Sequence, residues 1–171
     1  MSKKGQVWIE TVTYTLVAFV LIGLILAFVK PKIDELQDKA LIEQSLNIMR
    51  QIDSIINEVY GEGTGNKRLI EILVKKGKLT FDTQNDSLRF EFEGKYQYSQ
   101  DGQNYSESSF DIKTIKFGSV YRVLIEKEYS NFNFTYGDKD IPRVLSGSST
   151  PYRIFISNKG GAGQVIDFSL Q

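Results

Sequence analysis

The sequence contains no cysteine and no histidine. Without cysteine the chain has no disulfide framework, no thiol nucleophile and no thiolate metal ligand. Without histidine it lacks the commonest general base and the commonest ligand of transition metals, which disfavours a Ser-His-Asp hydrolase. We therefore expect a protein that is not an enzyme and that uses neither a metal ion nor another cofactor.

The chain also lacks an excess of charge of either sign, because 21 Lys and Arg residues balance 21 Asp and Glu residues. A neutral chain without a basic surface gives no reason to expect a nucleic-acid partner. Two short segments, residues 101–104 and 138–140, place oxygen ligands close together, as calcium loops do. Their spacing is not that of an EF-hand, and Asp, Gly and Asn are ordinary turn-forming residues, so we interpret both segments as turns.

A long uncharged run lies near the start of the chain. Between Glu10 and Lys30 the sequence reads TVTYTLVAFVLIGLILAFV, which makes a helix of about 28 Å, close to the ~30 Å hydrocarbon core of a bilayer. A secretory signal would place small residues at a cleavage site after this run, and the actual ending FVKPKID matches that pattern poorly. A second interpretation is a single-pass anchor, with Lys3 and Lys4 keeping the N-terminus in the cytoplasm.

Glu10 prompts a third interpretation. A carboxylate near the bilayer core costs free energy, about 2.5–3.5 kcal/mol at a helix centre and less near the end, so such residues are usually functional and paired. Cleavage between Gly5 and Gln6 would leave Glu10 four positions from a new α-amino group, about 6 Å along a helix. The amine of a neighbouring copy then reaches Glu10 after a small axial shift, and a paired charge is tolerated in apolar surroundings.

This arrangement resembles the N-terminus of type IV pilins, most closely the archaeal pilins and archaellins with a class III signal peptide. The matching residues are Lys3-Lys4-Gly5, then Gln6, then Glu10 at the fifth place of the mature chain, followed by the uncharged run to Val29. Each element alone is weak, but the combination is fairly specific. Gln6 as the first mature residue is more similar to pilins than to archaellins.

The resemblance implies that the chain is first processed in the membrane and then assembled into a filament. In that family a membrane peptidase cleaves after the glycine, and the shortened helices leave the membrane to form the core of a surface filament. Residues 1–5 would be the cleaved leader, and Glu10 would set the register between subunits. The processing site would consist of Lys3, Lys4, Gly5 and Gln6. The implied partners are other copies of the chain, a prepilin peptidase with its assembly machinery, and the cytoplasmic membrane before assembly.

Residues 31–60 continue the helix with an amphipathic pattern, which predicts a stripe packed on the protein's own head. The apolar stripe consists of Ile33, Leu36, Ala40, Leu41, Ile48, Met49, Ile52, Ile55, Ile56 and Val59. Asp38 is among the charged residues predicted on the opposite side. Pro31 lacks an N–H and crowds the carbonyl of Ala27, so we expect a kink there. Otherwise we expect one helix from residue 7, about 80 Å long and ending at Gly61.

A β-rich head is predicted after the helix. The glycine-rich segment GEGTGN, residues 61–66, is the expected linker, and it lacks the Gly-Lys-Ser/Thr ending of a phosphate loop. In residues 67–171, runs of aromatic and β-branched residues alternate with turn signals, as in the alternating SLRFEFE. The candidate strands are residues 69–75, 78–83, 87–93, 95–99, 110–117, 119–128, 132–136, 152–158 and 164–170. TQND and SQDGQN are expected hairpin turns.

Eight or nine strands at this spacing predict an antiparallel sandwich or a strongly curled sheet, and the family resemblance implies an immunoglobulin-like topology. The fold class is therefore α+β, with a long N-terminal helix, apolar over residues 6–30 and amphipathic over residues 31–60, before the head. Three Asn-x-Ser/Thr sequons in the head are candidate N-glycosylation sites: Asn85, Asn104 and Asn133. The first two lie in predicted turns, and Asn133 lies within a predicted strand.

Two functions from different classes follow from these observations. The favoured one is a structural pilin of an archaeal surface filament, made as a membrane precursor with its N-terminus inside and assembled through its apolar helix. The alternative is a single-pass, membrane-anchored β-sandwich that binds a surface, a sugar or a protein, with a minor pilin or adhesin lying between the two. The N-terminal residue of the natural protein discriminates between them.

Overall fold

The computed structural model describes residues 3–161 and 163–171, and the side chains of residues 3–6 are outside this description. The chain divides into two compact units, Met1–Gln37 and Asp38–Gln171. Helix α1 (Lys3–Gly61) contributes to both units, and its backbone is helical on both sides of Pro31. The predicted end of the helix at Gly61 is confirmed. The predicted kink at Pro31 stays a prediction.

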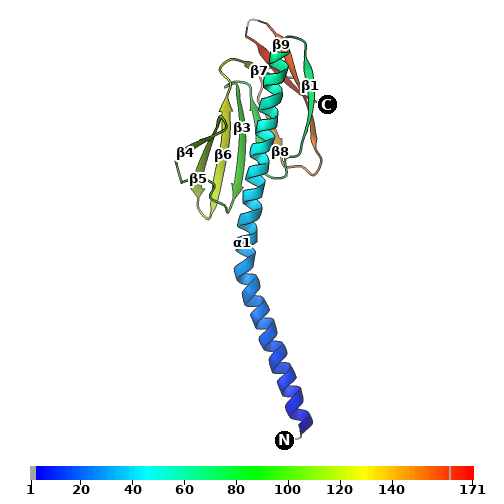
Figure 1. The fold of residues 1–171 in the computed structure, drawn as a ribbon, viewed down its shortest axis with the longest axis vertical. Helices are drawn as coiled ribbons and strands as arrows, with labels where there is room; N and C mark the ends of the chain where they lie inside the picture. The colour runs from blue at the N-terminus through cyan, green and yellow to red at the C-terminus, as the bar shows by residue number, and fades with distance from the viewer. Residues whose placement is uncertain (1–2, 162) are drawn as a thin grey trace. The chain divides into compact units, whose positions relative to one another are not determined.

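The second unit combines the last part of α1 with ten strands among the described residues. Their bounds are β1 (Lys67–Ile72), β2 (Lys78–Asp82), β3 (Ser87–Gly94), β4 (Asn104–Glu107), β5 (Phe110–Phe117), β6 (Val120–Glu128), β7 (Asn133–Tyr136), β8 (Arg143–Ser146), β9 (Tyr152–Gly160) and β10 (Val165–Leu170). A four-stranded sheet has the order β1-β9-β10-β7, and a six-stranded sheet has the order β4-β5-β6-β3-β2-β8. The predicted α+β class with a sandwich-like head is confirmed (Figure 1).

The strand pairs are antiparallel with one exception, since β7 runs parallel to β10. This pair joins Asn133 to Val165 and Tyr136 to Phe168 in register. The parallel direction differs from the wholly antiparallel head expected from the sequence. Local sequence patterns indicate where a strand lies, but the direction of its neighbour depends on segments distant in the chain.

The core of the second unit lies between the two sheets and residues 38–61 of α1, which Figure 1 shows running alongside them. The helix buries side chains at intervals of three and four residues, as an amphipathic helix must. The fully or nearly fully buried ones include Ile42, Leu46, Met49, Ile52, Ile56 and Val59. Across the sheets, the alternation predicted for SLRFEFE is confirmed, because Leu88, Phe90 and Phe92 are at most 1% exposed.

Four predictions about the amphipathic stripe are wrong, one of them at Ala40, which is exposed. Ile33 and Leu36 belong to the first unit and are 46% and 67% exposed, although the pattern placed them against the head. Asp38, predicted on the polar side, is buried. Its carboxylate accepts hydrogen bonds from Lys76 Nζ at 3.0 Å and from the backbone N–H of Lys95 at 2.6 Å. A buried carboxylate is stable when it is paired in this way, and a periodic pattern cannot reveal such a partner.

The strand assignments also need correction at three places. Residues 95–99 form no strand, whereas β4 and β8 were missed. Both missed strands are four residues long and lie at the two edges of the six-stranded sheet. Edge strands pair on one side only and are often short and polar, so they carry a weak sequence signal.

The two predicted hairpin turns have different outcomes. The TQND turn is confirmed, since β2 and β3 are antiparallel neighbours on either side of residues 83–86. Burial raises the pKa of the Asp82 carboxyl, but hydrogen bonds from Asn85 and from the backbone of Gln84 outweigh it and hold the pKa below its usual value. The prediction for SQDGQN is wrong, because this segment leads into β4 from residues that form no strand.

Candidate assembly segment and modification sites

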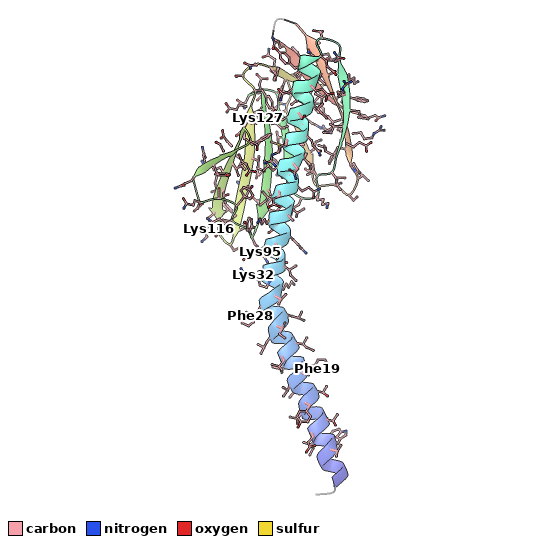
Figure 2. All side chains as sticks on the ribbon, viewed as in Figure 1. Phe19, Phe28, Lys32, Lys95, Lys116 and Lys127 are labelled. Carbon is pink, nitrogen blue, oxygen red and sulfur yellow. The ribbon has the colours of Figure 1, made fainter. Side chains whose placement is uncertain are left out.

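The first unit contains a helical surface that is apolar all round. Among the described residues, one helix is long and apolar enough to cross a membrane, and it begins near the N-terminus. The sixteen large hydrophobic side chains of residues 7–29 are each between 42% and 77% exposed. Figure 2 shows Phe19 and Phe28 projecting from this part of α1. Exposed apolar surface on this scale requires lipid or protein around it.

Three threonine hydroxyls in this segment are hydrogen-bonded within the helix itself. Thr11, Thr13 and Thr15 donate to the carbonyl oxygens four residues earlier, at distances of 2.8–2.9 Å. A hydroxyl that is bonded in this way does not need water, so it can enter hydrocarbon or a dry helix bundle at low cost. The polar residues of the run are therefore compatible with apolar surroundings.

Glu10 is the single charged residue between residues 7 and 29. It lies on α1 among the exposed apolar side chains Val7, Trp8 and Ile9. This places a carboxylate within the surface that lipid or other helices must cover. The side chains of the predicted processing residues Lys3, Lys4, Gly5 and Gln6 lie outside the described part, so the processing site stays a prediction.

The three sequons lie on the surface of the second unit in different settings. Asn85 is exposed in the β2–β3 turn, and its Nδ2 donates to Asp82 Oδ2 at 2.9 Å. Asn104 is exposed at the start of the edge strand β4. Asn133 starts β7, but its Nδ2 lies so close to Gly163 that even a methyl group there would collide with it. N-glycosylation attaches a bulky group at Nδ2, which needs open space around this atom.

We expect the sequons to differ in occupancy if the chain is exposed to a glycosylation machinery. Asn104 is expected to carry glycan, because it is exposed at a sheet edge and no hydrogen bond to another described residue holds its Nδ2. Asn85 is expected to be modified less, because its Nδ2 is bonded to Asp82 Oδ2. Asn133 is expected to remain unmodified because its amide packs on Gly163. Mass spectrometry of glycopeptides from the native host measures the three occupancies separately. Occupancy of Asn133 equal to that of Asn104 would contradict this structural explanation.

The two segments considered as calcium loops have other partners. Asp101 Oδ1 accepts a hydrogen bond from the backbone N–H of Lys116 at 2.8 Å. Asp138 forms an ion pair with Lys159 at 2.7 Å. In the part of the chain that the structure describes, no group of three or more acidic side chains is placed to hold a metal ion.

Sequence reasoning missed the polar groups that fix the head against α1. Asp53 Oδ1, on the helix, accepts from Lys127 Nζ at 2.7 Å and from the Tyr129 hydroxyl at 2.9 Å. Burial raises the pKa of Tyr129, and the neighbouring Asp53 carboxylate raises it further, so this hydroxyl stays protonated. The residues are 74 and 76 positions apart in the chain, and no local pattern connects them.

Comparisons of the chain with protein-family models, with curated proteins and with solved structures found no match. The architecture of the chain itself is therefore the basis for assigning the protein to a broad class. It has a long apolar N-terminal helix followed by a β-rich, sandwich-like head. This layout is compatible with a pilin and with a membrane-anchored module, and the helix indicates membrane insertion or a signal sequence.

Proposed function

We propose that this protein is a pilin, the structural subunit of an archaeal type IV pilus-like surface filament. The observation that carries the proposal is the exposed apolar surface of residues 7–29 together with the one carboxylate, Glu10, that it contains. A membrane anchor needs the apolar surface but has no use for the carboxylate. A helix that moves from lipid into a bundle of identical helices uses both.

Assembly has two steps in this proposal. A prepilin peptidase removes residues 1–5 at the site formed by Lys3, Lys4, Gly5 and Gln6. The assembly machinery then extracts the mature chain, and residues 6–30 pack with the same residues of neighbouring copies. At ~25 cal/mol per Å² of buried apolar area, this packing would contribute a free energy on the order of tens of kcal/mol per subunit. Since the starting state is lipid, the net gain comes mainly from close packing.

The remaining features fit a structural role outside the cell. The precursor resides in the cytoplasmic membrane with its N-terminus inside, and the head faces outward, where sequons are accessible to glycosylation. The proposal needs no catalytic residue, no cofactor and no nucleic-acid partner. The self-contacts of the filament are its principal interaction.

The N-terminus of the natural protein tests the proposal. We expect filaments sheared from the native host to contain this chain as a main component, with Gln6 as its first residue by mass spectrometry. Electron microscopy of the same preparation shows whether the chain is in filaments. A chain that begins at Met1 or Ser2 and stays in the membrane fraction would instead establish the alternative, a membrane-anchored β-sandwich that binds a partner at the cell surface.

A further inference from the structure

A small hollow lies in the second unit beside the edge strand β4. Its volume is about 280 Å³. We call it the tyrosine-amide hollow, and its lining residues are Tyr98, Ser99, Gln100, Gln103, Asn104 and Tyr105. None of these six residues carries a charge, although 25% of the chain is charged. The hollow therefore combines aromatic rings with neutral hydrogen-bonding groups.

The backbone around the hollow is fixed to strand β5. The N–H of Ser99 donates to Thr114 Oγ1 at 3.1 Å, and the N–H of Gly102 donates to the Thr114 carbonyl oxygen at 2.8 Å. Thr114 itself is fully buried. A third bond joins the Lys116 N–H to Asp101 Oδ1 at 2.8 Å. A segment fixed by three bonds is pre-formed, so a ligand does not have to order it on binding.

The Tyr98 side chain is held in place by Glu107, a residue that does not line the hollow. Its hydroxyl donates to Glu107 Oε2 at 3.0 Å, and the other carboxylate oxygen of Glu107 pairs with Arg50 of α1 at 2.6 Å. Burial, aided by the bond to Glu107, raises the pKa of Tyr98 to about 12, so the ring stays neutral. Tyr105, which also lines the hollow, is 50% exposed, so part of its side chain is open to a ligand.

The amide side chains of the hollow are available to a ligand. In residues 3–161 and 163–171, the side chains of Gln100, Gln103 and Asn104 form no hydrogen bond, and all three are exposed. Each amide offers both donors and an acceptor, which matches adjacent hydroxyl groups on a ligand. An anion would find no cation among the lining residues, and a cation would find no carboxylate there. An exposed aromatic ring adds an apolar surface that a flat, partly apolar ring can stack on.

We propose that the tyrosine-amide hollow binds a neutral saccharide ring, which stacks on Tyr105 and hydrogen-bonds to the amides of Gln100, Gln103 and Asn104. The hollow's volume suits a single ring with the rest of a glycan in solvent. This inference is independent of the filament proposal, because it concerns the head alone. It gives the head a binding activity in either a filament or a membrane anchor.

Saturation-transfer NMR tests the proposal on the full chain produced in a host without N-glycosylation. The chain is held in phosphocholine micelles, because a maltoside detergent would itself present sugar. The probes are the methyl glycosides of glucose, galactose, mannose and N-acetylglucosamine. We expect transfer from aromatic protons to at least one probe, and an affinity about tenfold lower for Tyr105→Ala. Tyr105→Phe keeps the ring and is expected to retain binding.

Phe117→Ala is the matched control, since Phe117 is also an exposed aromatic residue of the six-stranded sheet but does not line the hollow. Its affinity for the probes is expected to equal that of the natural chain. The proposal is overturned if no probe receives saturation. It is equally overturned if Tyr105→Ala binds normally, or if Phe117→Ala loses as much affinity as Tyr105→Ala.

The saccharide can come from two sources, a free glycan or a glycan attached to Asn104 of the same chain. Protein from the native host distinguishes them. If an attached glycan fills the hollow, the natural chain rejects the free glycoside, whereas Ser106→Ala from the same host, which loses the sequon but keeps every residue that lines the hollow, binds it. If the ligand is a free glycan, both chains bind it. Either result supports the saccharide chemistry. The proposal is overturned if the natural chain carries no glycan at Asn104 and both chains from the native host still fail to bind a probe that the unglycosylated chain binds.

Discussion

Replacing Glu10 with Ala is expected to lower filament yield at least about tenfold while leaving the amount of membrane-inserted precursor unchanged. Insertion should not suffer, because removing a carboxylate from an apolar helix lowers the cost of entering lipid. Assembly should suffer, because the α-amino group of the neighbouring subunit would lie among apolar side chains without its counter-charge. Leaving one partner of a buried ion pair alone costs about 3–5 kcal/mol, and each 1.4 kcal/mol is tenfold in an equilibrium constant.

Deprotonation of the amine limits this loss, since an α-amino group has an ordinary pKa of about 7.7–8.0 and can become neutral when it is desolvated. The expected loss of filaments is therefore about tenfold, which is smaller than the full cost of a buried unpaired charge would give. The same reasoning predicts that raising the pH relieves the defect of Glu10→Ala. Assembly assayed at two pH values measures this relief directly.

Glu43→Ala is the matched control for Glu10→Ala. Glu43 lies on the same helix, its side chain is 56% exposed, and its partner Lys39 is 3.8 Å away. Removing it deletes one negative charge without touching the apolar segment, so filament yield should stay near that of the natural chain. Yield is measured as filament protein sheared from equal cell mass, and insertion by immunoblot of membranes. Normal filaments from Glu10→Ala would remove this residue from the assembly mechanism.

The sequence was sufficient to predict the parts of the fold that local patterns specify. Composition and periodicity placed the end of α1 at Gly61 and the alternation of Leu88, Phe90 and Phe92. They failed where long-range pairing decides the outcome, as for buried Asp38 with Lys76, and for the parallel pair of β7 and β10. Periodicity marks a helix face as apolar but does not identify what covers it, which is why Ile33 and Leu36 were placed wrongly.

Part of the candidate site could be predicted from the sequence, and part could not. The apolar run and Glu10 are visible in the sequence because a charge inside an uncharged segment needs no structure to be noticed. The tyrosine-amide hollow is not visible, since Tyr, Gln and Asn in a loop are ordinary surface residues. They become a candidate site only when Thr114, at least nine positions away in the chain, fixes the loop around them.

The second large effect concerns the packing of the two sheets. Phe168 on β10 is fully buried, and its ring lies 4.6 Å from that of Phe81 and 4.9 Å from that of Phe134. Phe81 is on β2, in the six-stranded sheet, so Phe168 joins the two sheets. Phe168→Ala removes these contacts and leaves a cavity, and we expect the free energy of unfolding to fall by about 3–5 kcal/mol.

A loss of this size is a large part of the about 5–15 kcal/mol that stabilises an ordinary domain, and it corresponds to a fall of about 10–20 °C in Tm for a unit of this size. Near-UV circular dichroism of the full chain in micelles measures it, because eight of the nine tyrosines lie after residue 38 and report on the head. Phe168→Leu, which keeps part of the volume, is expected to lose less.

Phe117→Ala is the control that distinguishes the loss of core packing from the loss of an aromatic side chain at the surface. Phe117 is 65% exposed, so its removal creates no cavity and should change the free energy of unfolding by no more than about 0.5 kcal/mol. If Phe168→Ala were as stable as Phe117→Ala, the two sheets would not share a core at this position. Because head stability and helix assembly depend on different residues, Phe168→Ala should still form filaments at a temperature where the head remains folded. Glu10→Ala should show its about tenfold loss of filaments at every temperature at which its head is intact.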